Sequence, residues 1–253
     1  MVISIKIKMK KIALITGASK GLGFETALQL GKKGFTIIVT ARTQHKSDEA
    51  VTKLKTKHID ALGVQLDVNN SKDITNLVSF LNERFGKLDI LVNNAGVQLD
   101  FPGFMPGNST ETLSMEILKQ TFETNFFAPI ALTQKLLPLL KKSDAGRIVN
   151  VSSIMGSLAL HADAGSPIYG IKLLAYNSSK TALNQFTLHL AEALKDTLIK
   201  VNSAHPGWVK TDLGGEYAPM SIEDGVKTIV DLSTLDVNGK TGAFIHLGES
   251  LPW

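Results

Sequence analysis

Tyr176 and Lys180 are two side chains whose spacing suits proton transfer. They are four residues apart in a run expected to be helical, so they lie on one helix face, about 6 Å apart along the axis. An ammonium beside a phenol pulls the pKa of the phenol down from about 10 towards neutrality. Such a group can protonate a carbonyl oxygen or deprotonate an alcohol. Because this spacing is also common by chance, the pair needs support from the rest of the sequence.

A glycine-rich turn, TGASKGLG at 16–23, provides part of that support. It follows a short apolar run and leads into a helical pattern. Strand, glycine turn and helix together favour phosphate binding, since glycines admit the phosphate and the helix N-terminus offers free N–H groups. The order Gly-x-x-x-Gly-x-Gly formed by Gly17, Gly21 and Gly23 differs from the general dinucleotide fingerprint. A tight turn of purely structural use is the alternative.

Apolar runs alternate with helical patterns along the chain, which predicts a parallel sheet covered by helices on both faces. The expected strands are 11–15, 35–40, 64–67, 88–92, 147–151, 200–204 and 243–247. A long helix over 114–141 should break or kink, because Pro129 and Pro138 lie inside it. We expect a single-domain, doubly wound α/β fold over 11–253. Residues 1–10, where isoleucines alternate with lysines, are either an extra strand or a tail ahead of a natural start at Met9, and we favour the tail.

Composition excludes several classes of function. The 253 residues are 43% hydrophobic and 20% charged, which is typical of a globular protein. The net charge of +4 is spread along the chain without a basic cluster, so nucleic acid is not an expected partner. No cysteine is present and the histidines lack ligand spacing, so no metal site is expected. No apolar run is long enough for a membrane span, which favours a cytoplasmic protein, and no Gly-x-Ser-x-Gly hydrolase elbow occurs.

Several further motifs follow the glycine turn in a fixed order. They are Asp67-Val68, NNAG at 93–96, Asn125, VNVSS at 149–153, Tyr176-x-x-x-Lys180 and Pro206-Gly207. With the turn, they resemble the short-chain dehydrogenase/reductase family from residue 11 nearly to the C-terminus, which implies a Rossmann fold and a nicotinamide cofactor. PGWVKTD at 206–212, the ending at 251–253 and the longer loop before Tyr176 are most similar to the carbonyl reductase branch.

The resemblance implies a catalytic set of Asn125, Ser153, Tyr176 and Lys180. Tyr176 would donate the proton, and Ser153 would hold the carbonyl oxygen beside the phenol. Lys180 would lower the pKa of Tyr176 and bond the nicotinamide ribose. Asn125 would position Lys180 through a water relay.

Two neighbours compete for these roles. Ser152 and Ser153 are adjacent, so only one can face the site from a strand end, and motif register favours Ser153. Tyr169 is a second phenol, but the residue four places on is Leu173 rather than a lysine, which favours an ordinary loop aromatic.

The end of the second expected strand favours NADP(H) over NAD(H). NAD-selective sites place an acidic residue there for the ribose 2′-hydroxyl, whereas this chain has Ala41 followed by Arg42. A guanidinium can form paired charge-assisted hydrogen bonds with a 2′-phosphate. Lys20, inside the glycine turn, adds a second cation, as in NADP-preferring family members. The alternative is that both cations are solvated surface charges.

The remaining contacts with the cofactor are carried over from the family motifs. Asp67 would bond the adenine amino group or merely cap the strand end. Cofactor-binding positions are Gly17, Ser19, Lys20, Gly21, Leu22, Gly23, Arg42, Asp67, Val68, Asn94, Gly96, Tyr176, Lys180, Val209 and Thr211.

The expected function is NADPH-dependent reduction of a ketone or aldehyde. Fewer than ten residues separate Thr211 from a helix near Ser221, which suggests an open substrate site, with Trp208 as a pocket wall or as an anchor for its loop. The alternatives are a nucleotide-binding sensor or scaffold on the same fold, and oxidation of a specific pathway alcohol. A monomer and a homo-oligomer both remain open.

Overall fold

The computed structural model describes residues 10–100 and 110–253. The tail expected ahead of Met9 therefore lies outside the described residues.

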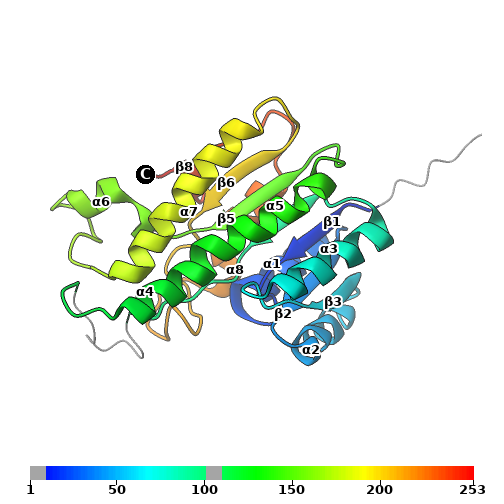
Figure 1. Cartoon of the computed structure of the whole chain (residues 1–253), viewed down its shortest axis with the longest axis horizontal. Coiled ribbons are helices and arrows are strands. Elements are labelled where there is room, and N and C mark those ends of the chain that lie inside the picture. Colours follow the sequence, from blue (N-terminus) through cyan, green and yellow to red (C-terminus); the bar gives the residue numbers. More distant parts are fainter. Residues whose placement is uncertain (1–9, 101–109) are drawn as a thin grey trace, which may run out of the picture.

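An eight-stranded sheet with the order β3-β2-β1-β4-β5-β6-β7-β8 runs through the centre of the molecule (Figure 1). Each pair of neighbours from β3 to β7 is parallel, and β8 returns antiparallel to β7. The strands are β1 Ile12–Ile15, β2 Thr36–Ala41, β3 Ala61–Gln65, β4 Ile90–Asn93, β5 Arg147–Val151, β6 Lys200–Ala204, β7 Ala243–His246 and β8 Glu249–Ser250. The seven strands expected from apolar runs are present, and among residues 10–100 and 110–253 the short β8 is the one strand that was not predicted.

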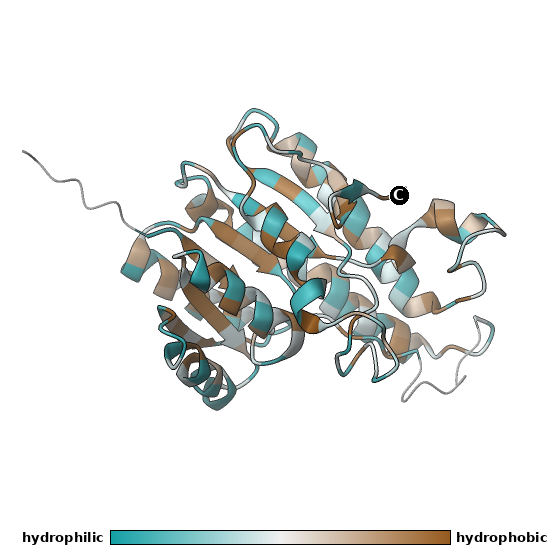
Figure 2. Cartoon of the chain, turned by 180° about the vertical axis from the view of Figure 1, so that it is seen from behind, coloured by the Kyte–Doolittle hydropathy of each residue, from teal (hydrophilic) through white to brown (hydrophobic). Residues whose placement is uncertain are grey.

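Helices cover both faces of this sheet, each over its own buried apolar cluster. One face carries α1 Gly21–Lys32, α2 Gln44–Lys55 and α9 Lys227–Ser233. The other carries α3 Ser71–Phe85, α5 Ala128–Leu140 and α7 Leu174–Ala193. Figure 2 shows hydrophobic strands at the centre of the molecule, flanked by helices that carry both hydrophilic and hydrophobic residues. The predicted doubly wound parallel sheet is confirmed.

Shorter helical elements complete the chain and flank the ends of the strands. They are α4 Met115–Phe122, the π-helix η1 Glu123–Phe127, the 3-10 helix η2 Ile154–Gly156, α6 Leu158–Ala162 and α8 Ile222–Gly225.

A π turn lies within the long helix that was expected to break or kink. Helices α4 and α5 are joined without interruption through η1, whose five residues include Asn125. Pro129, which has no N–H to donate, stands in the first turn of α5 directly after this wider turn, and Pro138 lies in the last turns of α5. The wider spacing of the π turn accommodates the hydrogen bond that Pro129 cannot donate. It also directs the side chain of Asn125 into the protein, where Asn125 is 1% exposed.

The order of the strands reverses at β1. The chain leaves β1 towards β2 and β3 on one side, whereas β4 to β7 extend the sheet on the other side. In a doubly wound sheet the crevice at such a switch point, beyond the carboxyl ends of the strands, is where ligands bind. The glycine turn follows β1, and the motif at 93–96 ends β4, so both flank this crevice.

Candidate active site

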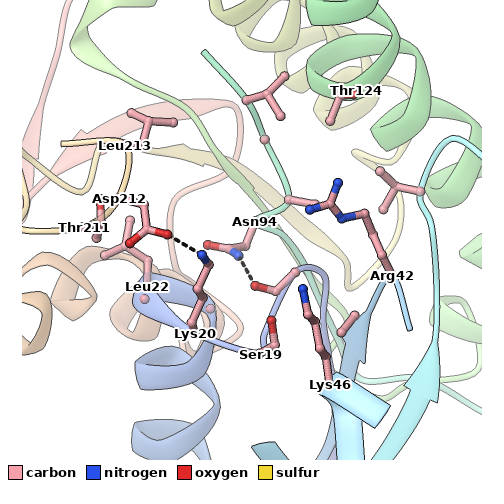
Figure 3. A pocket seen from close by; sticks show the side chains of 18 of the residues that line it. Ser19, Lys20, Leu22, Arg42, Lys46, Asn94, Thr124, Thr211, Asp212 and Leu213 are labelled. Carbon is pink, nitrogen blue, oxygen red and sulfur yellow. Dashed lines mark hydrogen bonds and ion pairs between the residues drawn. The ribbon is translucent and has the colours of Figure 1, made fainter. Parts of the chain in front are cut away.

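A cavity of about 950 Å³ opens at the switch point, which is large enough for an extended cofactor (Figure 3). Its walls come from the glycine turn, the ends of β2, β3 and β4, the π turn, and the segment after β6. The lining residues are Gly17, Ser19, Lys20, Gly21, Leu22, Gly23, Ala41, Arg42, Lys46, Leu66, Asp67, Val68, Asn69, Asn94, Ala95, Gly96, Val97, Thr124, Lys210, Thr211, Asp212, Leu213, Gly215, Glu216 and Ile222.

The glycine turn has the geometry of an anion cradle. Gly17 and Gly21 adopt positive φ angles of 62° and 57°, a region that favours glycine. A Cβ at Gly23 would lie 2.6 Å from both the Gly17 carbonyl oxygen and the Asn94 Nδ2, so no larger residue fits there without a shift. Helix α1 starts at Gly21 with no side-chain cap, so its first N–H groups are available to a phosphate.

Asn94 braces this turn against the end of β4. Its Nδ2 donates to the carbonyl oxygens of Thr16, at 2.7 Å, and Gly17, at 3.3 Å. The Thr16 hydroxyl in turn accepts from the backbone N–H groups of Asn94 and Ala95, both at 2.9 Å. The two segments that flank the crevice are thus joined side by side (Figure 3).

The cations around the cavity are distributed differently from the sequence-based expectation. Lys20 lines the cavity, but its ammonium forms an ion pair with Asp212 across the mouth (Figure 3). Arg42 and Lys46 lie on another side, and neither forms an ion pair with any residue of 10–100 or 110–253. Lys20 is thus paired, whereas Arg42 and its neighbour Lys46 are unpaired among the described residues; a contact of Lys20 with a 2′-phosphate stays a prediction.

Lys46, in helix α2, lines the cavity and was not among the site residues expected from the sequence. The helix begins at Gln44, after a Thr43 cap whose hydroxyl accepts from the Lys46 N–H. That start places Lys46 in the first turn of α2, near the end of β2. The signal was available in the sequence, since threonine is a favoured N-cap residue.

Asp67 and Val68, the residues expected near the adenine, lie in the loop that follows β3. The Asp67 carboxylate accepts from the Asn69 N–H at 3.0 Å and so shapes a local turn. Both residues line the cavity. Asp67 therefore has the structural role that was the alternative for it, and it also lines the cavity.

Ser153, Tyr176 and Lys180 are brought together beside this cavity. The Tyr176 hydroxyl is hydrogen-bonded with Ser153, whereas the Ser152 hydroxyl is buried with no partner among the described residues. The Lys180 Nζ donates to the Val151 carbonyl at 2.8 Å and lies 5.7 Å from the centre of the Tyr176 ring. Tyr169 lies apart, 44% exposed, with the Lys172 ammonium 4.7 Å from its ring.

Burial governs the titration of the phenol and the ammonium. It raises the pKa of Tyr176 to about 12, against the opposing effect of the hydrogen bond with Ser153, and it lowers the pKa of Lys180 to about 8. The expected shift of the Tyr176 pKa towards neutrality is therefore not found. The reason is that loss of hydration disfavours the charged form of both groups.

Asn125 holds the segment that runs past the active site. Its Oδ1 accepts from the Val97 N–H and its Nδ2 donates to the Val97 carbonyl, both at 2.8 Å, while Nδ2 also donates to the Ser179 hydroxyl at 3.0 Å. A Cβ at Gly96 would lie 3.3 Å from the Asn125 Oδ1 and 3.5 Å from the Lys180 Nζ, so both groups face Gly96. A water relay between them stays a prediction.

The segment after β6 closes another side of the cavity. Thr211 lines it, whereas Val209 is buried, pairs with Met220 and lies outside the lining. Trp208 is 54% exposed and also outside the lining, and its indole N–H donates to the Gly214 carbonyl at 2.7 Å. This hydrogen bond fits an anchor for the loop, while the exposed ring leaves a contact with substrate as a prediction.

Residues 10–100 and 110–253 contain no group of three or more histidine or acidic side chains placed to hold a metal ion. Within the same ranges, no helix has the length and apolarity needed to cross a bilayer.

A parallel sheet with a glycine-rich anion cradle, next to a buried serine, tyrosine and lysine, defines a nucleotide-dependent oxidoreductase. Residues 11–221 match the family model described as short chain dehydrogenase. The chain therefore belongs to the short-chain dehydrogenase/reductase family, near the carbonyl reductase branch, and acts on carbonyl or alcohol groups with a nicotinamide cofactor.

Similar proteins are found among both sequences and solved structures. A short-chain dehydrogenase, anuI, from Penicillium roqueforti is 38% identical, over 89% of each chain. Carbonyl reductase [NADPH] 1 of Mus musculus is 31% identical, over 96% of this chain and 99% of the mouse protein. The structure of NADPH-bound carbonyl reductase from chicken fatty liver is 28% identical, with a TM-score of 0.82 and coverage of 97% and 99%.

Proposed function

We propose that the protein reduces a ketone or an aldehyde to the alcohol, with NADPH as the hydride donor. One observation carries this proposal: the buried Tyr176 phenol is hydrogen-bonded with Ser153 close to the Lys180 ammonium. A sensor or scaffold on this fold needs the nucleotide cavity but has no use for a buried acid held by a second hydroxyl. The arrangement of Ser153, Tyr176 and Lys180 therefore favours catalysis over nucleotide binding alone.

The cavity offers suitable partners for each part of the cofactor. The glycine turn and the first N–H groups of α1 would hold the pyrophosphate. Arg42 and Lys46 would hold the 2′-phosphate, and Ala41 leaves no carboxylate at the strand end to repel it. Bound there, NADPH supplies the hydride.

Other residues would orient the two ends of the cofactor. Asp67 and Val68 would contact the adenine, while Asn94, Gly96 and Thr211 would line the path to the nicotinamide. Val209 packs against Gly225 of α8 and does not line the cavity. It would therefore support the cavity wall without contacting the cofactor itself.

Tyr176 is the proposed proton donor. With its pKa raised to about 12, the phenol is protonated at neutral pH and can give its proton to the oxygen that gains negative charge in reduction. Ser153, already hydrogen-bonded with the phenol, is placed to hold that oxygen. The same groups would serve the oxidation of an alcohol in the reverse direction, so the choice of reduction rests on the reductase relatives.

Lys180 and Asn125 are proposed to complete the site. Lys180 is fixed by the Val151 carbonyl and would stabilise the phenolate left after proton transfer, besides bonding the ribose. Asn125 holds the backbone of Val97, so that Gly96 lies between Asn125 and the ammonium.

The relatives support the choice of cofactor and of substrate class. The mouse protein is named as an NADPH carbonyl reductase, and the chicken structure contains NADPH. The short segment between Thr211 and Ser221 would leave the substrate side open to bulky carbonyl compounds, with the exposed ring of Trp208 as a contact.

The test is consumption of NADPH by the pure protein with a panel of activated ketones and aldehydes, run in parallel with NADH and with NADP⁺ plus the matching alcohols. Reduction with NADPH in clear excess over NADH is the expected result. Cofactor binding without turnover of any compound would support the sensor or scaffold instead. Turnover restricted to one alcohol with NADP⁺ would support the oxidation of a pathway alcohol.

A further inference from the structure

Asp100 provides the N-terminal cap of α7 from a distant part of the chain. Asp100 is 1% exposed, and both of its carboxylate oxygens accept backbone hydrogen bonds. Oδ1 accepts from the Ala175 N–H at 2.8 Å, and Oδ2 accepts from the Tyr176 N–H at 2.9 Å. These donors belong to the first turn of α7, whose own cap residue, Leu173, supplies no side-chain hydrogen bond.

The physical chemistry of a helix start makes this contact strong. The first N–H groups of a helix have no partner within it, and its N-terminus carries a partial positive charge. A carboxylate that accepts two of these N–H groups gives them hydrogen-bond partners and places a negative charge at the positive end of the helix. Because one of the two donors is the Tyr176 N–H, the contact fixes the backbone from which the phenol projects.

Asp100 is the last residue of the segment 96–100, which is also held in place at Val97. Residues 96–100 leave the NNAG motif, and Asn125 holds Val97 in this segment through two hydrogen bonds while bonding Ser179 of α7. Asp100 then bonds Tyr176 at the start of the same helix. The segment thus joins the wall of the cofactor cavity to the helix that carries the proposed acid.

We propose that Asp100 is a positioning residue for the reaction, which holds the first turn of α7 so that the Tyr176 phenol meets Ser153. This inference rests on the proposed role of Tyr176 as the acid. Its consequence is that loss of the Asp100 carboxylate lowers the rate of chemistry more than the binding of NADPH, because the glycine turn and Arg42 are untouched. A displacement of the reacting group by about 1 Å can cost on the order of 10²-fold in rate.

The experiment compares Asp100→Ala and Asp100→Asn with the unchanged protein. Asparagine keeps one acceptor oxygen but places an NH₂ group against the second N–H. We expect kcat to fall about 10–100-fold for alanine and less for asparagine, with the Kd for NADPH changed less than about twofold. An unchanged kcat in folded Asp100→Asn and Asp100→Ala proteins would overturn the proposal. If the Asp100→Ala protein does not fold, the kcat of Asp100→Asn alone tests the proposal.

Asp89→Asn is the matched control. Asp89 is also 1% exposed and accepts the Ile12 N–H at 2.9 Å, but it precedes β4, at the end of the sheet away from the cavity. Both variants should lower the unfolding temperature, and only the Asp100 variant should lower kcat. An equal fall in kcat per folded molecule for both would reduce Asp100 to a general stabilising residue and refute the proposal.

A double-mutant cycle with Tyr176→Phe separates this inference from the proposed function. If Asp100 acts through the phenol, Asp100→Asn lowers kcat in the unchanged protein but has almost no further effect beside Tyr176→Phe. Fully additive losses would overturn the positioning role. If Tyr176→Phe itself left reduction intact, the proposed function would fall, and the positioning role with it.

Discussion

Arg42→Ala should weaken the binding of NADPH selectively. Arg42 lines the cavity at the end of β2 and forms no ion pair with any described residue, so its guanidinium is available to a 2′-phosphate. A hydrogen bond to a charged group contributes about 1.5–3 kcal/mol. Since about 1.4 kcal/mol is a factor of ten, the Kd for NADPH should rise roughly 10–100-fold. NADH, which lacks this phosphate, should bind almost as before.

The assay is a fluorescence or calorimetric titration of each variant with both cofactors. Lys46→Ala should cause a loss of the same kind. Lys53→Ala, which removes the same charge from the last turn of α2, outside the cavity lining, is the control for net charge and should change little. Equal losses of NADPH and NADH affinity in Arg42→Ala, or an NADPH loss as large in Lys53→Ala, would refute the assignment of Arg42 to the 2′-phosphate.

Three further outcomes follow from the geometry. Gly23→Ala should destabilise the glycine turn by about 1–3 kcal/mol through overpacking, and its unfolding temperature and NADPH affinity should both fall; an unchanged affinity would contradict the cradle. In the cofactor-free protein the Tyr176 phenol should stay protonated through pH 10. Its phenolate absorbance, taken as the difference from Tyr176→Phe, should emerge only towards pH 12, and stability should fall over this range because the unfolded chain loses the proton first. Arg147→Lys should cost about 2–3 kcal/mol in denaturant unfolding, since the buried guanidinium donates five hydrogen bonds to backbone carbonyls at the amino end of β5, while kcat/KM stays unchanged.

The local features of the fold could be predicted from the sequence because they depend on neighbouring residues. Apolar runs of four to six residues gave the parallel strands, and the glycine turn marked the start of α1. The pairing of Ser153 with Tyr176 could be anticipated from motif order, since both follow β5 at the carboxyl edge of the sheet.

The remaining features depend on contacts between distant parts of the chain. Lys20 pairs with Asp212, 192 residues away, which no local pattern records. The cap that Asp100 gives to α7 spans 75 residues, and the π turn at Asn125 is the form taken by the break or kink expected from the two prolines of the long helix. The pKa of Tyr176 was misjudged for the same reason, because burial depends on the whole fold.

Tyr176→Phe is the measurement that tests the central claim most directly. The change keeps the ring and removes the acidic hydrogen, so the fold and NADPH affinity should survive, while kcat for carbonyl reduction falls by about 10²–10⁴-fold, the contribution of a general acid. Tyr169→Phe, at a phenol that lies apart and 44% exposed, should leave kcat nearly unchanged. Similar effects of the two substitutions, or a larger effect of Tyr169→Phe, would contradict the assignment of the active site.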